Sequence, residues 1–123
     1  MRIAYDARPL IPPQTGIGRY LQGVLEGLLR YRDIENFFLC SCKGIQVEEK
    51  IYADLRVKQL VAQGWKGTFW LQCILPFYLR RCQADLLHGS LYLSPFFCPC
   101  PSIAYVYDLS FRIFLTTWNA RIV

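Results

Sequence analysis

The sequence predicts a single α/β domain with a mostly parallel sheet and helices on both faces. Short apolar segments with the composition of strands alternate with longer segments in which apolar residues recur every three or four positions. Such alternation is typical of right-handed strand–helix–strand units and of a Rossmann-like sheet. The composition agrees, because 54% of the residues are hydrophobic and only 19% are charged, which suits strands covered on both faces. We expect residues 1–123 to form one such domain.

The first strand and the first helix flank a proline-rich turn. Ile3 and Tyr5 favour a strand over residues 2–6, and the segment 9–13 is too rich in proline to continue it. From Ile17 onward the apolar residues keep the spacing of an amphipathic helix with one buried stripe. The residues of that stripe are Ile17, Tyr20, Leu21, Val24, Leu25, Leu28 and Leu29.

Further strands and one interrupted helix complete the expected domain. Thr68 is expected to cap a helix that runs to Leu79, and Pro76, which has no amide hydrogen, is expected to kink or interrupt it. A proline-rich loop separates the last two strands. Strands are predicted over residues 37–42, 55–61, 85–88 and 103–107, the last of them ending at Asp108.

The glycine-rich turn before the first helix is a candidate anion site. Gly16 and Gly18 carry no side chain, and the unpaired amides of a first helical turn bear roughly half a positive charge. Because parallel strands end at one edge of the sheet, this turn, the loop after His88 and Asp108 are expected to gather there. The turn would then hold a phosphate or a sugar hydroxyl. The alternative is an ordinary turn that uses glycine only for its backbone freedom.

Several common sites are disfavoured by the residues around this turn. Leu21 stands where a dinucleotide fingerprint has its third glycine, so we expect no nicotinamide cofactor. The lysine-containing phosphate loop of nucleoside triphosphatases is missing. His88 is the only histidine, and no serine elbow surrounds Ser90, which argues against acyl transfer.

Charge and cysteine usage narrow the choice of partners. The net charge of +5 is spread along the chain, which disfavours nucleic acid but leaves a mild attraction for an anionic ligand or lipid surface. The six cysteines include the pairs Cys40/Cys42 and Cys98/Cys100, and one intervening residue is a poor spacing for structural zinc. Buried thiols in a reducing compartment are therefore expected, and a thiol–metal module is kept as an alternative. No secretory signal or spanning segment is visible, so we expect a cytoplasmic protein, with contact to the inner membrane face left open.

Several short motifs, in their order and spacing, resemble family-4 glycosyltransferases. The resemblance implies the GT-B architecture, in which two Rossmann-like lobes face a cleft, and it runs along nearly the whole chain as the N-terminal, acceptor-side lobe. It implies transfer of a sugar from a nucleotide-sugar donor to a sugar or lipid-linked acceptor, with retention at the anomeric carbon and with no metal or other cofactor. The motifs are Ile3-Ala4-Tyr5-Asp6-Ala7-Arg8-Pro9, Thr15-Gly16-Ile17-Gly18-Arg19-Tyr20, residues 70–76, Asp85-Leu86-Leu87-His88-Gly89 and Tyr107-Asp108-Leu109-Ser110-Phe111.

The same resemblance assigns roles to individual positions. Gly16, Ile17, Gly18 and Arg19 correspond to the loop that lines the cleft beside the donor phosphates and the acceptor. His88, Ser90 and Tyr92 correspond to a loop that faces the same cleft and shapes the acceptor side. Tyr107 and Asp108 stand in the catalytic segment, where the family usually has His-Asp-Leu. Tyrosine donates a hydrogen bond, but its pKa of about 10 makes it a poor proton shuttle at neutral pH.

The family's second lobe, which binds the nucleotide sugar, has no counterpart in these 123 residues. We therefore expect no transfer by this lobe unless a partner chain completes the cleft. The alternative function is a non-catalytic module, derived from such a lobe, that docks on another transferase or on a membrane surface through exposed apolar residues.

Overall fold

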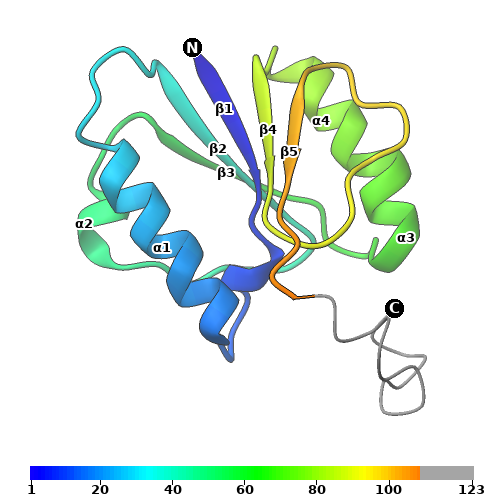
Figure 1. The fold of residues 1–123 in the computed structure, drawn as a ribbon, viewed down its shortest axis with the longest axis horizontal. Helices are drawn as coiled ribbons and strands as arrows, with labels where there is room; N and C mark the ends of the chain where they lie inside the picture. The colour runs from blue at the N-terminus through cyan, green and yellow to red at the C-terminus, as the bar shows by residue number, and fades with distance from the viewer. Residues whose placement is uncertain (109–123) are drawn as a thin grey trace.

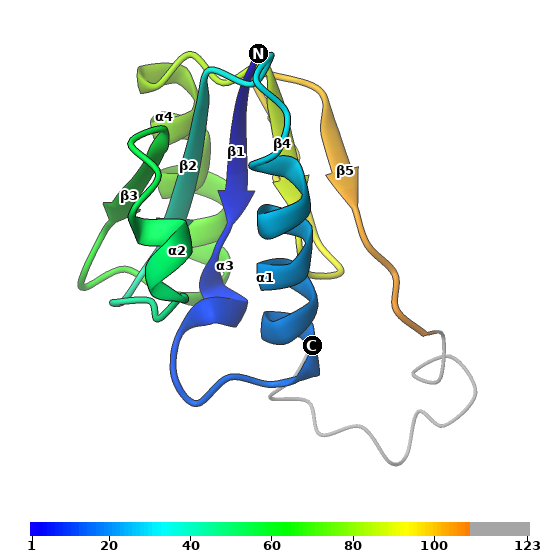
Figure 2. The same ribbon diagram turned by 90° about the vertical axis from the view of Figure 1, so that its left-hand side faces the viewer.

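Five parallel strands form the central layer of the computed structural model, which describes residues 1–108. In sequence order they are β1 (Arg2–Asp6), β2 (Asn36–Ser41), β3 (Val57–Val61), β4 (Leu86–Gly89) and β5 (Ser102–Ala104). Their order across the sheet is β3-β2-β1-β4-β5, and each of the four pairings is parallel (Figures 1 and 2). The prediction of an α/β fold with a parallel sheet is confirmed, and the arrangement is compatible with a Rossmann-like domain.

Helices cover both faces of the sheet, as the sequence predicted (Figure 1). One face carries α1 (Gly16–Leu28) and α2 (Glu49–Tyr52), and the other carries α3 (Gly67–Phe69), the π-helical segment η2 (Trp70–Ile74) and α4 (Leu75–Arg81). Each face has its own core, because successive strand residues point to opposite sides. The buried core on the α1 face includes Tyr5, Leu21, Leu25, Phe37 and Leu39, and the core on the other face includes Ala4, Phe38, Trp70, Leu75, Leu79 and Leu87.

The helical segment after β3 differs from the prediction at its start but shows the expected interruption next to Pro76. It begins at Gly67 after Lys66, and no side-chain hydrogen bond caps its first turn, so the assignment of Thr68 as the cap is wrong. The rings of Trp65 and Phe69 lie 4.8 Å apart across that turn and hold the chain where it enters the helix. The regular helix is interrupted just before Pro76, as the sequence predicted. The Leu75 amide bonds the carbonyl of Trp70, five residues earlier, so the helix widens into a π turn before the proline.

The last strand is shorter than predicted. The sequence indicated residues 103–107, but β5 ends at Ala104, and residues 105–108 follow it without forming a strand. The cause lies in its only neighbour, because β4 ends at Gly89, the residue paired with Ala104. Beyond that pair no strand remains for Tyr105 to join. The motif residues 109–111 lie outside the described residues.

Within residues 1–108, no helix has the length and apolar character needed to cross a bilayer.

Candidate functional site

The strand order reverses between β1 and β4, and this switch point is where open α/β sheets bind ligands. The chain leaves β1 through the short 3-10 helix η1 (Arg8–Leu10) and then enters α1, whose first turn lies at the carboxyl ends of the strands (Figure 1). The loop that follows β4 starts at the same edge. The glycine-rich turn at Gly16 and the loop after His88, which the sequence predicted to lie together, are therefore both at this edge of the sheet.

A buried ion pair closes the end of β1. Asp6 is 1% exposed, and its carboxylate accepts hydrogen bonds from Arg8 Nε at 2.9 Å and from Arg8 Nη2 at 2.7 Å. The guanidinium carbon lies 4.8 Å from the centre of the Trp70 ring, a cation–π contact with the helix on the opposite face. Burial opposes the charge of Arg8, but the hydrogen bonds and charge of Asp6 outweigh it and raise the pKa of Arg8. The guanidinium of Arg8 is therefore paired with Asp6 and is not the group that we expect to bind a ligand.

Two hydrogen bonds join the ends of β1, β4 and β5. The buried Ser90 hydroxyl donates to the carbonyl of Asp6, across the switch point. The Tyr107 hydroxyl donates to the Ser90 carbonyl at 2.8 Å. Burial raises the pKa of Tyr107, and the neighbouring tyrosines add to this effect, so its hydroxyl stays protonated at neutral pH. Ser90 and Tyr107 therefore form one connected unit.

Four tyrosine rings gather beside this unit and form what we call the tyrosine cluster: Tyr20, Tyr92, Tyr105 and Tyr107. Tyr20, from the second turn of α1, contacts Tyr105 at 5.7 Å and Tyr107 at 6.0 Å between ring centres. Tyr92 contacts Tyr107 at 5.8 Å. Tyr20 is 43% exposed and Tyr107 36% exposed, so part of the cluster is open to solvent. Such rings are suited to stack on a flat apolar face while their hydroxyls make hydrogen bonds.

His88 lies beneath the tyrosine cluster and is almost fully buried. Its ring is 4.9 Å from that of Tyr5 and 4.7 Å from that of Tyr105. Neither of its ring nitrogens, nor the hydroxyl of Tyr5, has a hydrogen-bond partner among the described residues. Burial lowers the pKa of His88, and burial followed by the proximity of Tyr105 raises the pKa of Tyr5. Both groups are therefore neutral at pH 7.

We expect acidification to destabilise the protein through His88. Because its pKa is lowered in the folded state, the unfolded chain binds a proton more readily below about pH 6.5, and stability then falls by at most about 1.4 kcal/mol per pH unit until the folded-state pKa is reached. Urea unfolding at pH 7 and at pH 5 measures this slope. His88→Phe keeps an aromatic ring but removes the titration, and an unchanged slope in that variant would contradict the assignment.

The two predicted glycines lie in different surroundings, although both are in the first turn of α1. A side chain at Gly16 would meet nothing within 4 Å, whereas a Cβ at Gly18 would lie 2.4 Å from the carbonyl oxygen of Pro9. Gly18 is therefore a packing glycine, buried between α1 and η1, and Gly16 is the open one. Thr15 makes no side-chain hydrogen bond to this turn, and the turn carries no acidic residue. The backbone amides of this first turn therefore receive no side-chain cap and can donate hydrogen bonds to an anion.

The other two residues of the predicted loop lie in different surroundings. Ile17 is half-buried. Arg19 is exposed and lines a surface hollow of about 430 Å³ together with residues 12–14 and 46–48, on the β2 side of α1. No residue of the loop after β4 lines this hollow. The structure therefore does not bring Arg19 together with Ser90 and Tyr107.

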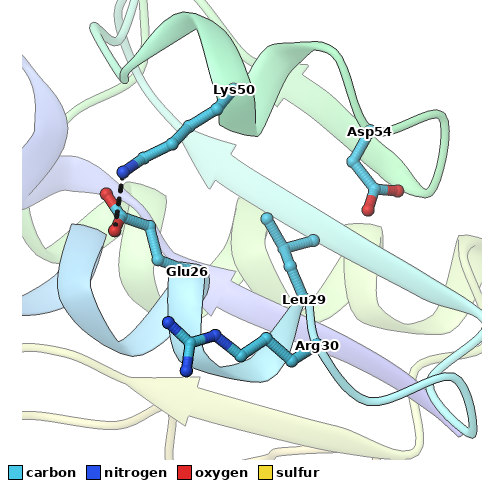
Figure 3. A pocket seen from close by; sticks show the side chains of 5 residues that line it. All are labelled: Glu26, Leu29, Arg30, Lys50 and Asp54. Carbon is cyan, nitrogen blue, oxygen red and sulfur yellow. Dashed lines mark ion pairs between the residues drawn. The ribbon is translucent and has the colours of Figure 1, made fainter.

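A second hollow lies beside the last turns of α1 (Figure 3), whereas the carboxyl ends of the strands lie beside its first turn (Figure 1). The Lys50 ammonium reaches the Glu26 carboxylate at 3.0 Å and that of Glu48 at 3.2 Å, so its charge is balanced. Arg30 and Asp54 complete a lining of mixed charge. This arrangement is typical of a solvated ion-pair network, and we assign it no ligand.

The cysteines are placed mainly for packing. Cys42, Cys82, Cys98 and Cys100 pack against the core on the α4 face, and Cys40 is buried within it. The Cys98 and Cys100 sulfurs lie 4.0 Å apart, and burial, followed by the charge of Cys98, raises the pKa of Cys100 to about 12. Among residues 1–108, no group of three or more His, Cys, Asp or Glu side chains is arranged to hold a metal ion.

Five residues of this site were not among those predicted: Tyr5, Asp6, Arg8, Tyr20 and Tyr105. A detectable signal existed for one pair, because a carboxylate at the end of a buried strand with arginine two residues later favours a local ion pair. The tyrosines carried no comparable signal, since the contacts of Tyr20 with Tyr105 and of Tyr5 with His88 join segments more than eighty residues apart. Of the predicted residues, Ser90, Tyr92 and Tyr107 contact one another or share a neighbour, and Asp108 follows them as an exposed residue.

Comparison of the chain with protein-family models, with curated proteins and with solved structures yields no match.

Proposed function

We propose that this chain is the acceptor-side lobe of a retaining GT-B glycosyltransferase, in which the first turn of α1 meets the phosphates of a nucleotide sugar. The observation that carries the proposal is the open, uncapped helix start at Gly16, which lies at the switch-point edge of a parallel sheet. Two of the segments that resemble family-4 glycosyltransferases, the turn at Gly16 and the end of the strand at His88-Gly89, lie at this same edge. The two observations are independent, since one concerns backbone geometry and the other residue identity.

The chemistry of the turn fits a departing diphosphate. When the bond to the sugar breaks, negative charge grows on the phosphate oxygens, and amides already aimed at that position stabilise it without reorganisation. The glycine at position 16 lets a ligand approach the backbone closely. Because Arg8 is paired with Asp6, the nearby positive charge for this purpose comes from the helix start.

The tyrosine cluster supports an acceptor-side role. The Tyr107 hydroxyl donates a hydrogen bond to the Ser90 carbonyl, so in this proposal it positions the loop after β4 rather than serving as a proton shuttle. Tyr20 and Tyr107 keep exposed ring surface, which suits stacking against a sugar ring. In this proposal Asp108 stands next to the acceptor, and His88 supports the cluster from below.

Titration of 15N-labelled protein with UDP-glucose and GDP-mannose tests the proposal. We expect the amide signals of Gly16 and Ile17 to shift at millimolar donor, because the lobe holds only one side of the cleft. Gly16→Asp places a carboxylate where the phosphate would lie and is expected to weaken binding at least about tenfold through like-charge repulsion.

Gly23→Asp is the matched control. It makes the same change in charge on the same helix, and a side chain there also meets nothing within 4 Å. If neither donor shifts the Gly16 and Ile17 amides, or if both variants weaken binding equally, the proposal is wrong. Sugar transfer by residues 1–123 is expected only together with a donor-binding lobe.

A second candidate function is a non-catalytic interaction module derived from such a lobe. The observation that favours it is the loop between β4 and β5, where Phe96 and Phe97 are 89% and 86% exposed. Large aromatic side chains exposed next to each other are characteristic of a binding surface.

A further inference from the structure

The face of the molecule formed by α3, η2, α4 and the loop after β4 carries an exposed aromatic surface. Phe69, Cys73 and Phe77 are spaced four residues apart, and all three are exposed, so they line the outer side of one continuous helical segment. Trp65 packs on Phe69 and is 51% exposed. We call this surface the aromatic face, and it comprises Trp65, Phe69, Cys73, Phe77, Phe96 and Phe97.

The two phenylalanines of the loop are held next to the helix. The Phe96 amide donates a hydrogen bond to the Gln72 side chain at 2.8 Å. Gln72 precedes Cys73 on η2, so Phe96 and its neighbour Phe97 lie beside the helical stripe. The aromatic side chains from these two segments therefore form one surface rather than scattered exposed residues.

The charge around the aromatic face has a single sign. Between Asp54 and Asp85 the sequence holds Lys58, Lys66, Arg80 and Arg81 and no acidic residue, and residues 86–107 hold no charged residue at all. Arg56, in the same stretch, lies over the Phe37 ring of the opposite core and pairs with Asp54. Lys58 lies over the Phe38 ring on this side of the sheet, and Arg80 and Arg81 occupy the last turn of α4. Among the residues that the structure describes, Lys58, Lys66, Arg80 and Arg81 form no salt bridge.

The opposite face of the molecule shows the contrast. There Lys50 is paired with Glu26 and Glu48, and Glu49 lies in α2. Acidic residues therefore lie among the basic ones on that face, where Lys50 is paired although Arg19 and Arg30 form no ion pair within residues 1–108, whereas no acidic residue accompanies the basic residues along the helical segment of the aromatic face. A hollow next to Trp65 adds a further ammonium, because Lys43 and Lys66 both line it.

We propose that the aromatic face docks on an anionic lipid surface. Aromatic side chains insert at the boundary between headgroups and acyl chains, and lysine and arginine side chains attract the anionic headgroups. The surface meets both requirements, with aromatic residues along its centre and unpaired basic residues at its ends. A protein partner or a second copy of the chain would need shape complementarity but has no general need for unbalanced positive charge. This docking does not depend on the proposed sugar transfer.

Co-sedimentation of the full chain with lipid vesicles tests the proposal. We expect binding to phosphatidylcholine vesicles that contain about 30% phosphatidylglycerol, little binding to pure phosphatidylcholine, and release by high salt. Phe96→Ser combined with Phe97→Ser is expected to reduce partitioning at least about tenfold, since it removes two rings from the lipid boundary. Arg80→Gln combined with Arg81→Gln should reduce binding to the anionic vesicles selectively.

Leu55→Ser is the matched control, because Leu55 is 94% exposed and lies outside the aromatic face. Its partitioning should equal that of the unsubstituted protein, and circular dichroism melting shows whether each variant remains folded. Equal binding to neutral and anionic vesicles, or unchanged binding by the Phe96/Phe97 variant, would overturn the proposal. A variant that loses self-association in sedimentation equilibrium, with lipid binding absent throughout, would assign the face to a second copy instead. Because no nucleotide sugar is present in these assays, their failure would leave the proposed function standing.

Discussion

Asp6→Asn is expected to lower the free energy of unfolding by about 3 kcal/mol, the largest effect of any single polar substitution at the strand ends. The carboxylate of Asp6 is 1% exposed and takes two guanidinium hydrogen bonds from Arg8 as well as its backbone amide at 3.3 Å. The neutral amide leaves the guanidinium over Trp70 without its counter-charge in a largely buried place. Chemical denaturation at pH 7 measures the loss.

Asp54→Asn is a closely matched control. Asp54 and Arg56 repeat the same arrangement two residues apart, with Nη2 to Oδ2 at 2.8 Å, but both side chains are about one quarter exposed. Solvent screening should limit its loss to about 1 kcal/mol or less. Similar losses for the two variants would show that burial does not set the strength of the Asp6 pair.

Gly18→Ala is expected to cost about 2–3 kcal/mol and to lower the melting temperature by about 10 °C or more. The added Cβ would lie 2.4 Å from the Pro9 carbonyl oxygen, which is backbone and cannot rotate away. Either α1 or η1 must then move, and both flank the candidate anion site. Thermal melting followed by circular dichroism measures the loss.

Gly23→Ala provides the comparison within the same helix. A Cβ at position 23 meets nothing within 4 Å, so alanine there should stabilise the helix by about 0.5–1 kcal/mol. Opposite signs at the two glycines are the expected result. A neutral Gly18→Ala variant would mean that α1 does not pack closely on η1.

The fold could be predicted from local patterns because its elements depend on short-range periodicity. Strand β1 and helix α1 lie within one residue of their predicted bounds, since alternating apolar residues and the three-and-four spacing determine which face is buried. The end of β5 could not be predicted in this way. It depends on where β4 ends, and the ladder partner of Ala104 is fifteen residues away at Gly89.

The candidate site was predictable only in part, for a similar reason. Gly16 and Gly18 look alike in the sequence, but the Pro9 carbonyl, which approaches only in three dimensions, gives them different roles. Likewise, Tyr107 could be recognised as a motif position, whereas its hydrogen bond to Ser90 joins two loops. The proposed catalytic and substrate-binding roles remain predictions.

The π turn in η2 also determines which way the ring of Trp70 faces. Such a turn accommodates one residue more than a regular α-helix, and each residue rotates the helix by about 100°. Deleting one residue between Trp70 and Leu75 would restore regular winding, but it would swing the indole away from the Arg8 guanidinium. The rotation of this helical segment about its own axis is therefore coupled, through Trp70, to the Asp6–Arg8 ion pair at the end of β1 on the other side of the contact.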